Sequence, residues 1–371
     1  MEDMQEFGTV ERAMMTRAAS RGVPINGSLE LLPLCNMNCD MCYVRLSKAE
    51  MDAAGTMRTA EEWLAVGREM AEAGVLFLLL TGGEPLLHPQ FREIYLGLKA
   101  MGMILTVNTN ATLIDEAWAD FFAQNKPRRI NITIYGGCGE SYERLCHYEK
   151  GFERAVRGVK LLRDRGVDVR AGYSVTPENR GDMERIFALA KELDVPLISD
   201  TYMQPAVRER SKPFNHHSRL FPEEAAAANI MKLRLDKGED AFRQYAAEVL
   251  RQVASFVPGE ENPCKAGCMA GKCSFNVDWL GRMKPCVLAP EPAANVFELG
   301  FLEAWKRIRE GFGAIRYCSR CSVCALRPLC PVCPVAVYHE TGNYMDVPDY
   351  LCRYAAELHR LLADTPEECH E

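Results

Sequence analysis

Between about residues 27 and 200, short apolar or β-branched runs alternate with stretches whose apolar residues follow helical spacing. The runs predict strands at residues 28–33, 75–81, 104–108, 129–135, 168–175 and 196–200. The amphipathic stretches predict helices at residues 59–72, 90–101, 116–124, 151–165 and 181–193. This alternation predicts an α/β fold with a parallel sheet. About six βα units are enough for a curled partial (β/α)6 barrel and too few for a closed eight-stranded one.

The pattern changes after Ser218. Two helical stretches, 223–234 and 241–256, predict a helical bridge, and a cysteine-rich segment at 262–353 follows in which periodicity is weak. We expect bound metal to hold this segment together, because its apolar content looks too thin for a core. The predicted domains are an N-terminal extension (1–25), a barrel (26–218), the bridge (219–258), a cysteine-rich domain (259–355) and a tail (356–371).

Composition narrows the functional classes. The chain has 371 residues, 48% of them hydrophobic, and a formal net charge of −7. This charge does not favour general nucleic-acid binding. The first 22 residues lack the apolar run of a secretory signal, and the longest apolar run, at 75–80, is too short to span a bilayer. We therefore expect a cytoplasmic protein. In that reducing compartment, sixteen cysteines favour metal ligation over disulfides.

Three cysteines follow the first predicted strand with the spacing C-x3-C-x2-C: Cys35, Cys39 and Cys42, before Tyr43. A cubane iron–sulfur cluster normally takes four cysteines, so three thiolates leave one iron open for a reactant. The alternatives are a structural zinc site or buried unliganded thiols. A structural zinc site needs a fourth protein ligand, which the neighbouring side chains do not obviously supply.

A second motif, Thr81-Gly82-Gly83-Glu84-Pro85, directly follows the buried strand at 75–81. Two glycines let a ligand approach the backbone, the Glu84 carboxylate can accept from an ammonium group, and Pro85 fixes the turn. Ligands of such sheets bind at the carboxyl ends of the strands, where this turn lies beside the three cysteines.

Together these motifs resemble the radical S-adenosylmethionine (radical SAM) superfamily, over about residues 26–215. The resemblance implies that Cys35, Cys39 and Cys42 hold a catalytic [4Fe–4S] cluster that binds S-adenosyl-L-methionine (SAM). It also implies that reduction of the cluster cleaves SAM to a 5′-deoxyadenosyl radical. The expected contacts to the methionine amino group are Gly82, Gly83, Glu84 and Pro85, and Tyr43 is expected near the adenine.

The resemblance suggests four further SAM contacts: Asn108 and Asn110 for the ribose, Arg144 for the carboxylate and Ser174 for the sugar. Turn chemistry is an alternative reading for the two asparagines. Many relatives carry a second arginine at the position of Cys146. Cys138 and Cys146 flank a predicted loop at 139–145 and are expected at the barrel mouth, as a hydrogen-atom donor, a substrate contact or small packing residues.

Ten cysteines between 264 and 352 form the third constellation, for which zinc ribbons are one interpretation. The spacing resembles the SPASM extension of radical SAM peptide and protein maturases, except that its last gap has two residues where three are usual. The resemblance implies two auxiliary [4Fe–4S] clusters. The first would use Cys268, Cys273, Cys286 and Cys333, with Cys264 competing for the place of Cys273. The second would use Cys321, Cys324, Cys330 and Cys352, and Cys318 has no assigned role.

The resemblance therefore implies a radical SAM oxidoreductase that modifies a ribosomally made precursor peptide, forming a thioether or C–C crosslink. A flavodoxin- or ferredoxin-type reductant is expected. Because the first cluster cysteine comes within 35 residues, the precursor is expected to be recognised by a separate leader-recognition protein or directly. The alternative is an anaerobic sulfatase-maturating, formylglycine-forming enzyme, although Val287 stands where those enzymes place an acidic base. A non-catalytic iron–sulfur electron carrier would not need the turn at 82–85. His216, His217, Cys369 and His370 are expected to be inert. The sequence names neither the peptide nor the bond formed.

Overall fold

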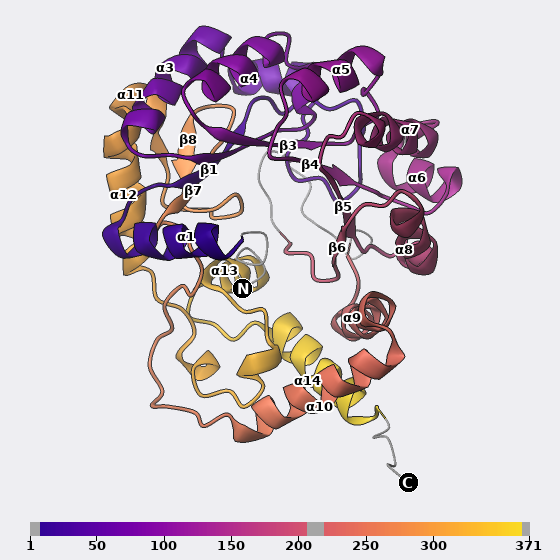
Figure 1. Ribbon diagram of the computed structural model, residues 1–371. Coiled ribbons are helices and arrows are strands. Elements are labelled where there is room, and N and C mark those ends of the chain that lie inside the picture. Colours follow the sequence, from indigo (N-terminus) through magenta and orange to yellow (C-terminus); the bar gives the residue numbers. More distant parts are fainter. Residues whose placement is uncertain (1–7, 206–218, 366–371) are drawn as a thin grey trace.

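The computed structural model describes residues 8–205 and 219–365, and its centre is one nine-stranded sheet. The strand order is β6-β5-β4-β3-β2-β1-β7-β8-β9, and every neighbouring pair from β6 to β7 is parallel. Figure 1 shows this sheet curling around a central space, with helices outside. The strands of the barrel are β1 (Asn26–Glu30), β2 (Phe77–Thr81), β3 (Ile104–Thr109), β4 (Arg129–Thr133), β5 (Val169–Ser174) and β6 (Leu197–Asp200). The predicted partial barrel is confirmed.

The outer helices follow the predicted ranges within a few residues: α3 (Ala60–Glu72), α4 (Phe91–Ala100), α5 (Glu116–Gln124), α7 (Gly151–Asp164) and α8 (Met183–Glu192). Local side chains explain where two of them begin. The Thr59 hydroxyl accepts from the Glu62 amide while Glu62 accepts from the Thr59 amide, and Asp115 accepts from the Trp118 amide. Such caps satisfy amides that have no partner within the helix.

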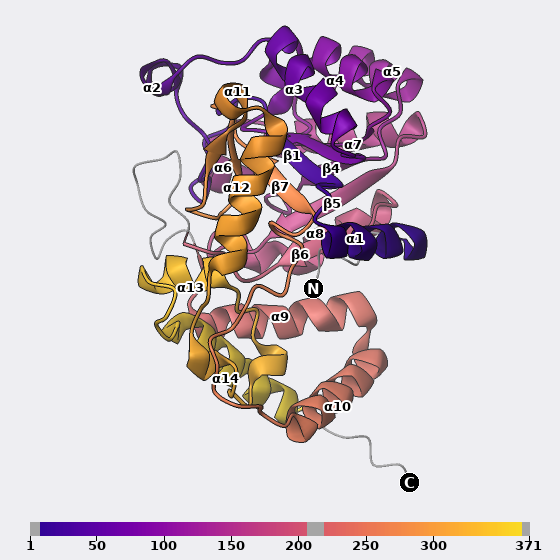
Figure 2. The same ribbon diagram turned by 90° about the vertical axis from the view of Figure 1, so that its left-hand side faces the viewer.

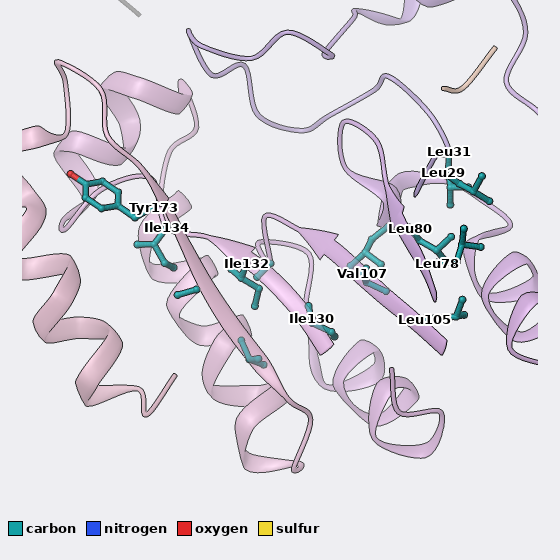
Figure 3. Packing of buried hydrophobic residues seen from close by; sticks show 14 of the residues in the cluster. Leu29, Leu31, Leu78, Leu80, Leu105, Val107, Ile130, Ile132, Ile134 and Tyr173 are labelled. Carbon is teal, nitrogen blue, oxygen red and sulfur yellow. The ribbon is translucent and has the colours of Figure 1, made fainter. Parts of the chain in front are cut away.

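Apolar and polar side chains alternate along the strands, so that one face of the sheet packs in the core and the other faces the central space. Leu105 and Val107 of β3 and Ile130 and Ile132 of β4 are buried in the main hydrophobic cluster under the helices, as Figure 3 shows. The residues that alternate with them, such as Thr106 and Asn108, point the other way because successive side chains of a strand lie on opposite faces. Polar side chains therefore line the inside of the barrel at the ends of its strands.

Within residues 8–205, three α-helices were not predicted: α1 (Thr9–Arg21), α2 (Lys48–Ala54) and α6 (Gly139–Cys146). The prediction of a loop at 139–145 is wrong, because Tyr142, Leu145 and Cys146 recur at helical spacing and are all fully buried. The helix begins directly after Cys138, which is its N-cap residue.

The first part of the cysteine-rich segment completes the sheet. Strands β7 (Ser274–Val277), β8 (Arg282–Lys284) and β9 (Ala294–Asn295) extend it beyond β1, and α11 (Val296–Leu299) and α12 (Phe301–Ala314) cover them. Phe275, Met283, Phe301 and Ile308 belong to the main hydrophobic cluster. The expectation that the apolar content of this segment is too thin for a core is therefore wrong for residues 274–314. Strands of two to four residues are too short to show periodicity in the sequence.

Below the barrel lie the predicted helical bridge, α9 (Pro222–Lys237) and α10 (Glu239–Ser255), and the last helix, α14 (Asp349–Ala363), which packs on α9 (Figure 2). The remaining elements are helix α13 (Pro334–Thr341) and four short 3-10 turns: η2 (Pro85–Leu87), η3 (Arg180–Asp182), η4 (Ser319–Cys321) and η5 (Arg327–Leu329).

No helix within residues 8–205 and 219–365 has the length and apolar character needed to cross a bilayer. His216, His217, Cys369, His370 and the predicted boundary at 218 lie outside the described residues.

Candidate functional site

A cavity of about 420 Å³ opens at the carboxyl ends of the parallel strands. Its lining residues come from the ends of β2 to β6 and from residues 35–44, 202–204 and 288. Among the predicted contacts, Tyr43, Gly82, Gly83, Asn108, Asn110 and Ser174 line it, together with all three N-terminal cysteines. The position agrees with the general rule that ligands of parallel α/β sheets bind at this edge.

The three-cysteine loop, residues 35–43, presents its thiols to one side of this cavity. Burial, with smaller contributions from the nearby Glu84, Cys39 and Cys42, raises the pKa of Cys35 to about 12. Backbone amides point at two of the sulfurs, since the Met37 N–H lies 3.4 Å from Cys35 Sγ and the Arg45 N–H lies 3.3 Å from Cys42 Sγ. Buried thiols become thiolates when a cation compensates the charge, and amides that donate to sulfur stabilise cluster ligands. The loop therefore fits an iron–sulfur cluster.

The glycines of the second motif pack so closely against the neighbouring backbone that a side chain would not fit there. The Gly83 and Glu84 amides donate to the carbonyls of Leu32 and Leu34, each at 2.8 Å. A Cβ atom on Gly83 would lie 2.3 Å from the Leu34 carbonyl oxygen, a distance no side chain tolerates. The turn thus holds the segment that leads into Cys35, in addition to lining the cavity. Sequence reasoning had assigned the glycines only to the approach of a ligand.

We expect Gly83→Ala to displace the three-cysteine loop, since the added methyl group meets backbone atoms that cannot rotate away. Iron incorporation and SAM cleavage should fall by about 10–100-fold, the usual cost of disturbing the support of metal ligands. Iron analysis and 5′-deoxyadenosine formation after anaerobic reconstitution measure both. Gly313→Ala is the matched control, because a Cβ atom at Gly313 meets nothing within 4 Å. Full iron content in the Gly83 variant would contradict this account.

The Glu84 carboxylate is fully buried and does not line the cavity. It accepts from the Thr109 hydroxyl and the Asn110 amide, both at 2.8 Å, and from the Leu86 amide at 3.1 Å. Burial raises its pKa to about 7 in spite of these three donors. Glu84 therefore ties the turn after β2 to the end of β3, and the predicted contact with the SAM amino group stays a prediction.

Asn110 connects the end of β3 to the three-cysteine loop. Its side-chain amide donates to Asn36 Oδ1 at 2.9 Å and points at Cys35 Sγ at 3.7 Å, and its oxygen accepts from the Thr112 amide and hydroxyl. The bonds from Thr112 agree with the turn reading of this residue, and the contact of Asn110 with the SAM ribose stays a prediction. Asn108 accepts from the Asn131 side chain at 2.8 Å. The partners Asn36 and Thr112 carry no recognisable motif and were missed.

Arg144 does not line the cavity. It lies on α6 with its side chain about half exposed, 2.7 Å from Glu140 Oε1, and it donates to the Glu178 carbonyl at 3.3 Å. The predicted contact with the SAM carboxylate has no support in this geometry.

We expect Arg144→Ala to leave the Kd for SAM unchanged and to change the free energy of unfolding by about 0–1 kcal/mol, as for other exposed ion pairs. Equilibrium binding of SAM to the reconstituted enzyme is the measurement, with Glu140→Ala as the control that removes the same ion pair. A tenfold loss of SAM affinity confined to the Arg144 variant would restore the residue to the site.

Cys138 and Cys146 are expected at the barrel mouth, and neither lines the cavity. Cys138 is half-buried before α6, where hydrogen bonds from Ser141 lower its pKa. Cys146 ends the helix, fully buried, and packs against Met37, Cys39 and Met41 of the three-cysteine loop. A hydrogen bond with the Cys146 thiol and burial hold the pKa of Cys39 well above its ordinary value.

Most of the C-terminal thiols lie in two hydrophobic clusters. Cys268, Cys286 and Cys333 share one of them, whereas Cys273 is fully buried in a separate cluster beside α1 and β2, where burial raises its pKa to about 11. Cys321, Cys330 and the unassigned Cys318 lie in the other, against which Cys333 also packs, and Cys324 and Cys352 lie near Cys330. Cys264 belongs with this second group, since it pairs with Tyr317 through two backbone hydrogen bonds of 2.8 and 3.0 Å.

Within the described ranges, no three His, Cys, Asp or Glu side chains converge on the position of a single metal ion.

The cavity extends from the three-cysteine loop to the first C-terminal cysteine group, because Leu288, two residues after Cys286, also lines it. Tyr202 also lines it, and its hydroxyl donates to Glu340 Oε1 of α13 at 2.9 Å. Four of the cavity residues that the sequence did not predict, Tyr135, Tyr202, Met203 and Gln204, follow the ends of β4 and β6, and that position was the available signal.

Known proteins agree with this architecture. The radical SAM superfamily matches residues 29–190. An AdoMet-dependent heme synthase of Methanosarcina barkeri is 27% identical over 75% of this chain and 80% of its own length. The subtilosin biosynthesis protein AlbA of Bacillus subtilis is 24% identical over 74% of this chain, which spans 58% of that relative. The structure of Streptococcus suis SuiB bound to precursor peptide SuiA superposes with a TM-score of 0.68 at 16% identity, covering 92% of this chain and 80% of SuiB.

Proposed function

Because the chain belongs to the radical SAM superfamily and shares the fold of a SPASM-type enzyme, we propose that it oxidatively modifies a ribosomally made peptide. The product would carry a thioether or a C–C crosslink. One observation carries the proposal: the cavity runs from the three-cysteine loop to Leu288, beside the first C-terminal cysteine group. A substrate in this cavity would lie between a centre that starts a radical reaction and a centre that can remove an electron.

In this proposal Cys35, Cys39 and Cys42 hold a [4Fe–4S] cluster, which supplies the electron that cleaves SAM to a 5′-deoxyadenosyl radical. The chain's own residues position the reactants. The turn at Gly82 and Gly83 fixes the approach to Cys35, and Asn108, Asn110 and Ser174 present polar groups along the same wall. Tyr43 lies in the lining beside the loop, as expected for an adenine contact.

The far wall would provide the outlet for the surplus electron. Leu288 lies two residues after Cys286, and the His339 ring, whose Nε2 is 2.7 Å from the Leu288 carbonyl oxygen, fixes the backbone there. We assign Cys268, Cys273, Cys286 and Cys333 to the first auxiliary [4Fe–4S] cluster and Cys321, Cys324, Cys330 and Cys352 to the second. With four thiolates each, these clusters have no open iron, which favours electron acceptance over substrate ligation.

The partners belong to the same proposal. The precursor peptide would be recognised directly or through a separate leader-binding protein, and a flavodoxin- or ferredoxin-type protein would supply electrons in a reducing, cytoplasmic setting. One relative is named as a heme synthase and another as a biosynthesis protein of the bacteriocin subtilosin, so the substrate class is the point that an experiment has to decide. The electron-carrier alternative is not kept, because the chain is an enzyme of this superfamily.

The test is anaerobic incubation of the reconstituted full chain with SAM, dithionite and short peptides encoded beside its gene. A peptide that loses two hydrogens, with 5′-deoxyadenosine formed, supports the proposal, and Cys35→Ala is the control that should give neither. Parallel reactions contain a sulfatase-derived Cys or Ser peptide and iron coproporphyrin III. Conversion of one of these, with no change in any precursor peptide, would replace the proposed function by formylglycine formation or by porphyrin oxidation.

A further inference from the structure

A carboxylate faces the cavity from the edge strand of the barrel. Asp200 is the last residue of β6, it is exposed, and it lines the cavity. It lies directly opposite Ser174 of β5, which also lines the cavity. Residues that face each other on neighbouring strands point to the same side of a sheet, so the Asp200 side chain lies on the inner face of the barrel.

The backbone on both sides of this carboxylate is fixed. The Asp200 carbonyl accepts from the Val175 amide at 2.9 Å. Two residues further on, the Tyr202 hydroxyl donates to Glu340 Oε1 of α13 at 2.9 Å. The Asp200 side chain therefore extends from a held strand end into the space where a substrate would bind.

Helix α13 also holds the part of the cavity wall that follows Cys286. The His339 ring lies 2.7 Å from the Leu288 carbonyl oxygen, and Leu288 lines the cavity. His339 and Glu340 are adjacent residues, so one turn of α13 supports both the segment after Asp200 and the segment that contains Leu288. The carboxylate and the wall beside the proposed electron acceptor are thus parts of one connected structure.

Asp200 is the only aspartate or glutamate among the described residues of the cavity lining. Glu84 does not line the cavity, is fully buried and already accepts three hydrogen bonds. The other polar side chains of the described lining are hydroxyls, phenols, carboxamides and the three thiols assigned to the cluster. Hydroxyls and carboxamides carry no negative charge at neutral pH, whereas a carboxylate can act as a general base.

We propose that Asp200 is the general base of the oxidative step, an inference that rests on the proposed function. Once a hydrogen atom has been removed from a peptide carbon, that carbon bonds to a sulfur or to a second carbon, which has to lose its own hydrogen. The new bond forms as this S–H or C–H proton moves to an Asp200 carboxylate oxygen and one electron passes to the first auxiliary cluster. The peptide has then lost two hydrogens, one as an atom and one as a proton.

Two substitutions test this role in the reconstituted full chain, with SAM, dithionite and the short peptides encoded beside its gene. Asp200→Asn keeps the size of the side chain without a base, whereas Asp200→Glu keeps a carboxylate. We expect Asp200→Asn to lower kcat for the modified peptide by about 100-fold or more, as the loss of a general base does, and Asp200→Glu to retain more activity. KM for the peptide, Kd for SAM and iron content should stay unchanged.

The matched control is Asp168→Asn. This aspartate comes directly before β5, at the amino end of the strand, lies 3.0 Å from Arg129 Nε and does not line the cavity. The control should modify the peptide at the wild-type rate.

The fate of the peptide radical gives a second readout. A radical that cannot complete the new bond takes one electron from dithionite and one deuteron from D2O. We therefore expect the unmodified peptide from Asp200→Asn to gain carbon-bound deuterium while 5′-deoxyadenosine is still formed. Mass spectrometry after back-exchange in H2O measures this label, which a purely structural defect would not produce.

Four results would overturn the inference. The first is a wild-type kcat in Asp200→Asn, and the second is an equal loss in the Asn and Glu variants. The third is a raised peptide KM or SAM Kd with unchanged kcat, which would assign Asp200 to binding. The fourth is a wild-type chain that modifies none of the peptides: the proposed function then fails first, and the inference falls with it.

Discussion

Cys35→Ala should abolish reductive cleavage of SAM while leaving the protein folded. Cys35 lines the cavity, and its sulfur lies within reach of the Met37 amide and the Asn110 side chain, so its loss removes one of three thiolates from the loop. Removal of a residue that merely supports a ligand costs about 10–100-fold in metal affinity or activity, and removal of a ligand should cost more. We expect 5′-deoxyadenosine at background and a loss of about four iron atoms per chain, one cubane cluster.

The control for this prediction is Cys138→Ala, which removes a half-buried thiol outside the cavity and should retain wild-type iron and activity. Circular dichroism shows whether each variant is folded. Cleavage of SAM by the Cys35 variant at the wild-type rate would mean that the three-cysteine loop does not hold the catalytic cluster, and the proposed function would lose its basis.

The strands and helices of the barrel could be predicted where the alternation of apolar and polar residues was long enough to be recognised. Apolar and polar side chains alternate in residues 105–108 and 129–133, and the place of these residues in the sheet was predictable. Strand β9 has two residues, and no periodicity exists at that length. Helix α6 was missed because Gly136 and Gly137 precede it and its apolar face faces a loop instead of the sheet.

In the site, too, the residues that belong to a sequence motif were predicted, and the residues that support them were not. Cys35, Cys39 and Cys42 were found because their spacing is short and their chemistry specific. Their supporting contacts come from residues far apart in the sequence: Asn110 reaches the loop from the end of β3, and Cys146 reaches it from α6. Ordinary asparagines and cysteines carry no pattern that predicts such contacts, and only the fold brings them together.

Glu340→Ala should destabilise the protein by about 3–5 kcal/mol, the usual cost of leaving one partner of a buried ion pair alone. Glu340 on α13 receives both Arg219 nitrogens, at 2.9 and 3.0 Å, and the two side chains are only 6% and 14% exposed. Tyr202 donates to the same carboxylate, and the Arg219 guanidinium lies 3.9 Å from the centre of the Tyr350 ring. The network thus joins the cavity wall after β6 to the cysteine-rich part of the chain.

Denaturant unfolding of the reconstituted full chain measures this effect, and two comparisons identify its cause. Glu223→Ala removes an ion pair with Arg353 in which the side chains are 45% and 51% exposed, so it should cost about 0–1 kcal/mol. The double variant Arg219→Met with Glu340→Leu removes both charges together, and it should be more stable than Glu340→Ala because no buried charge is left unpaired. Equal losses in the Glu223 and Glu340 variants would show that the Arg219–Glu340 pair is not what holds the cavity wall against α13.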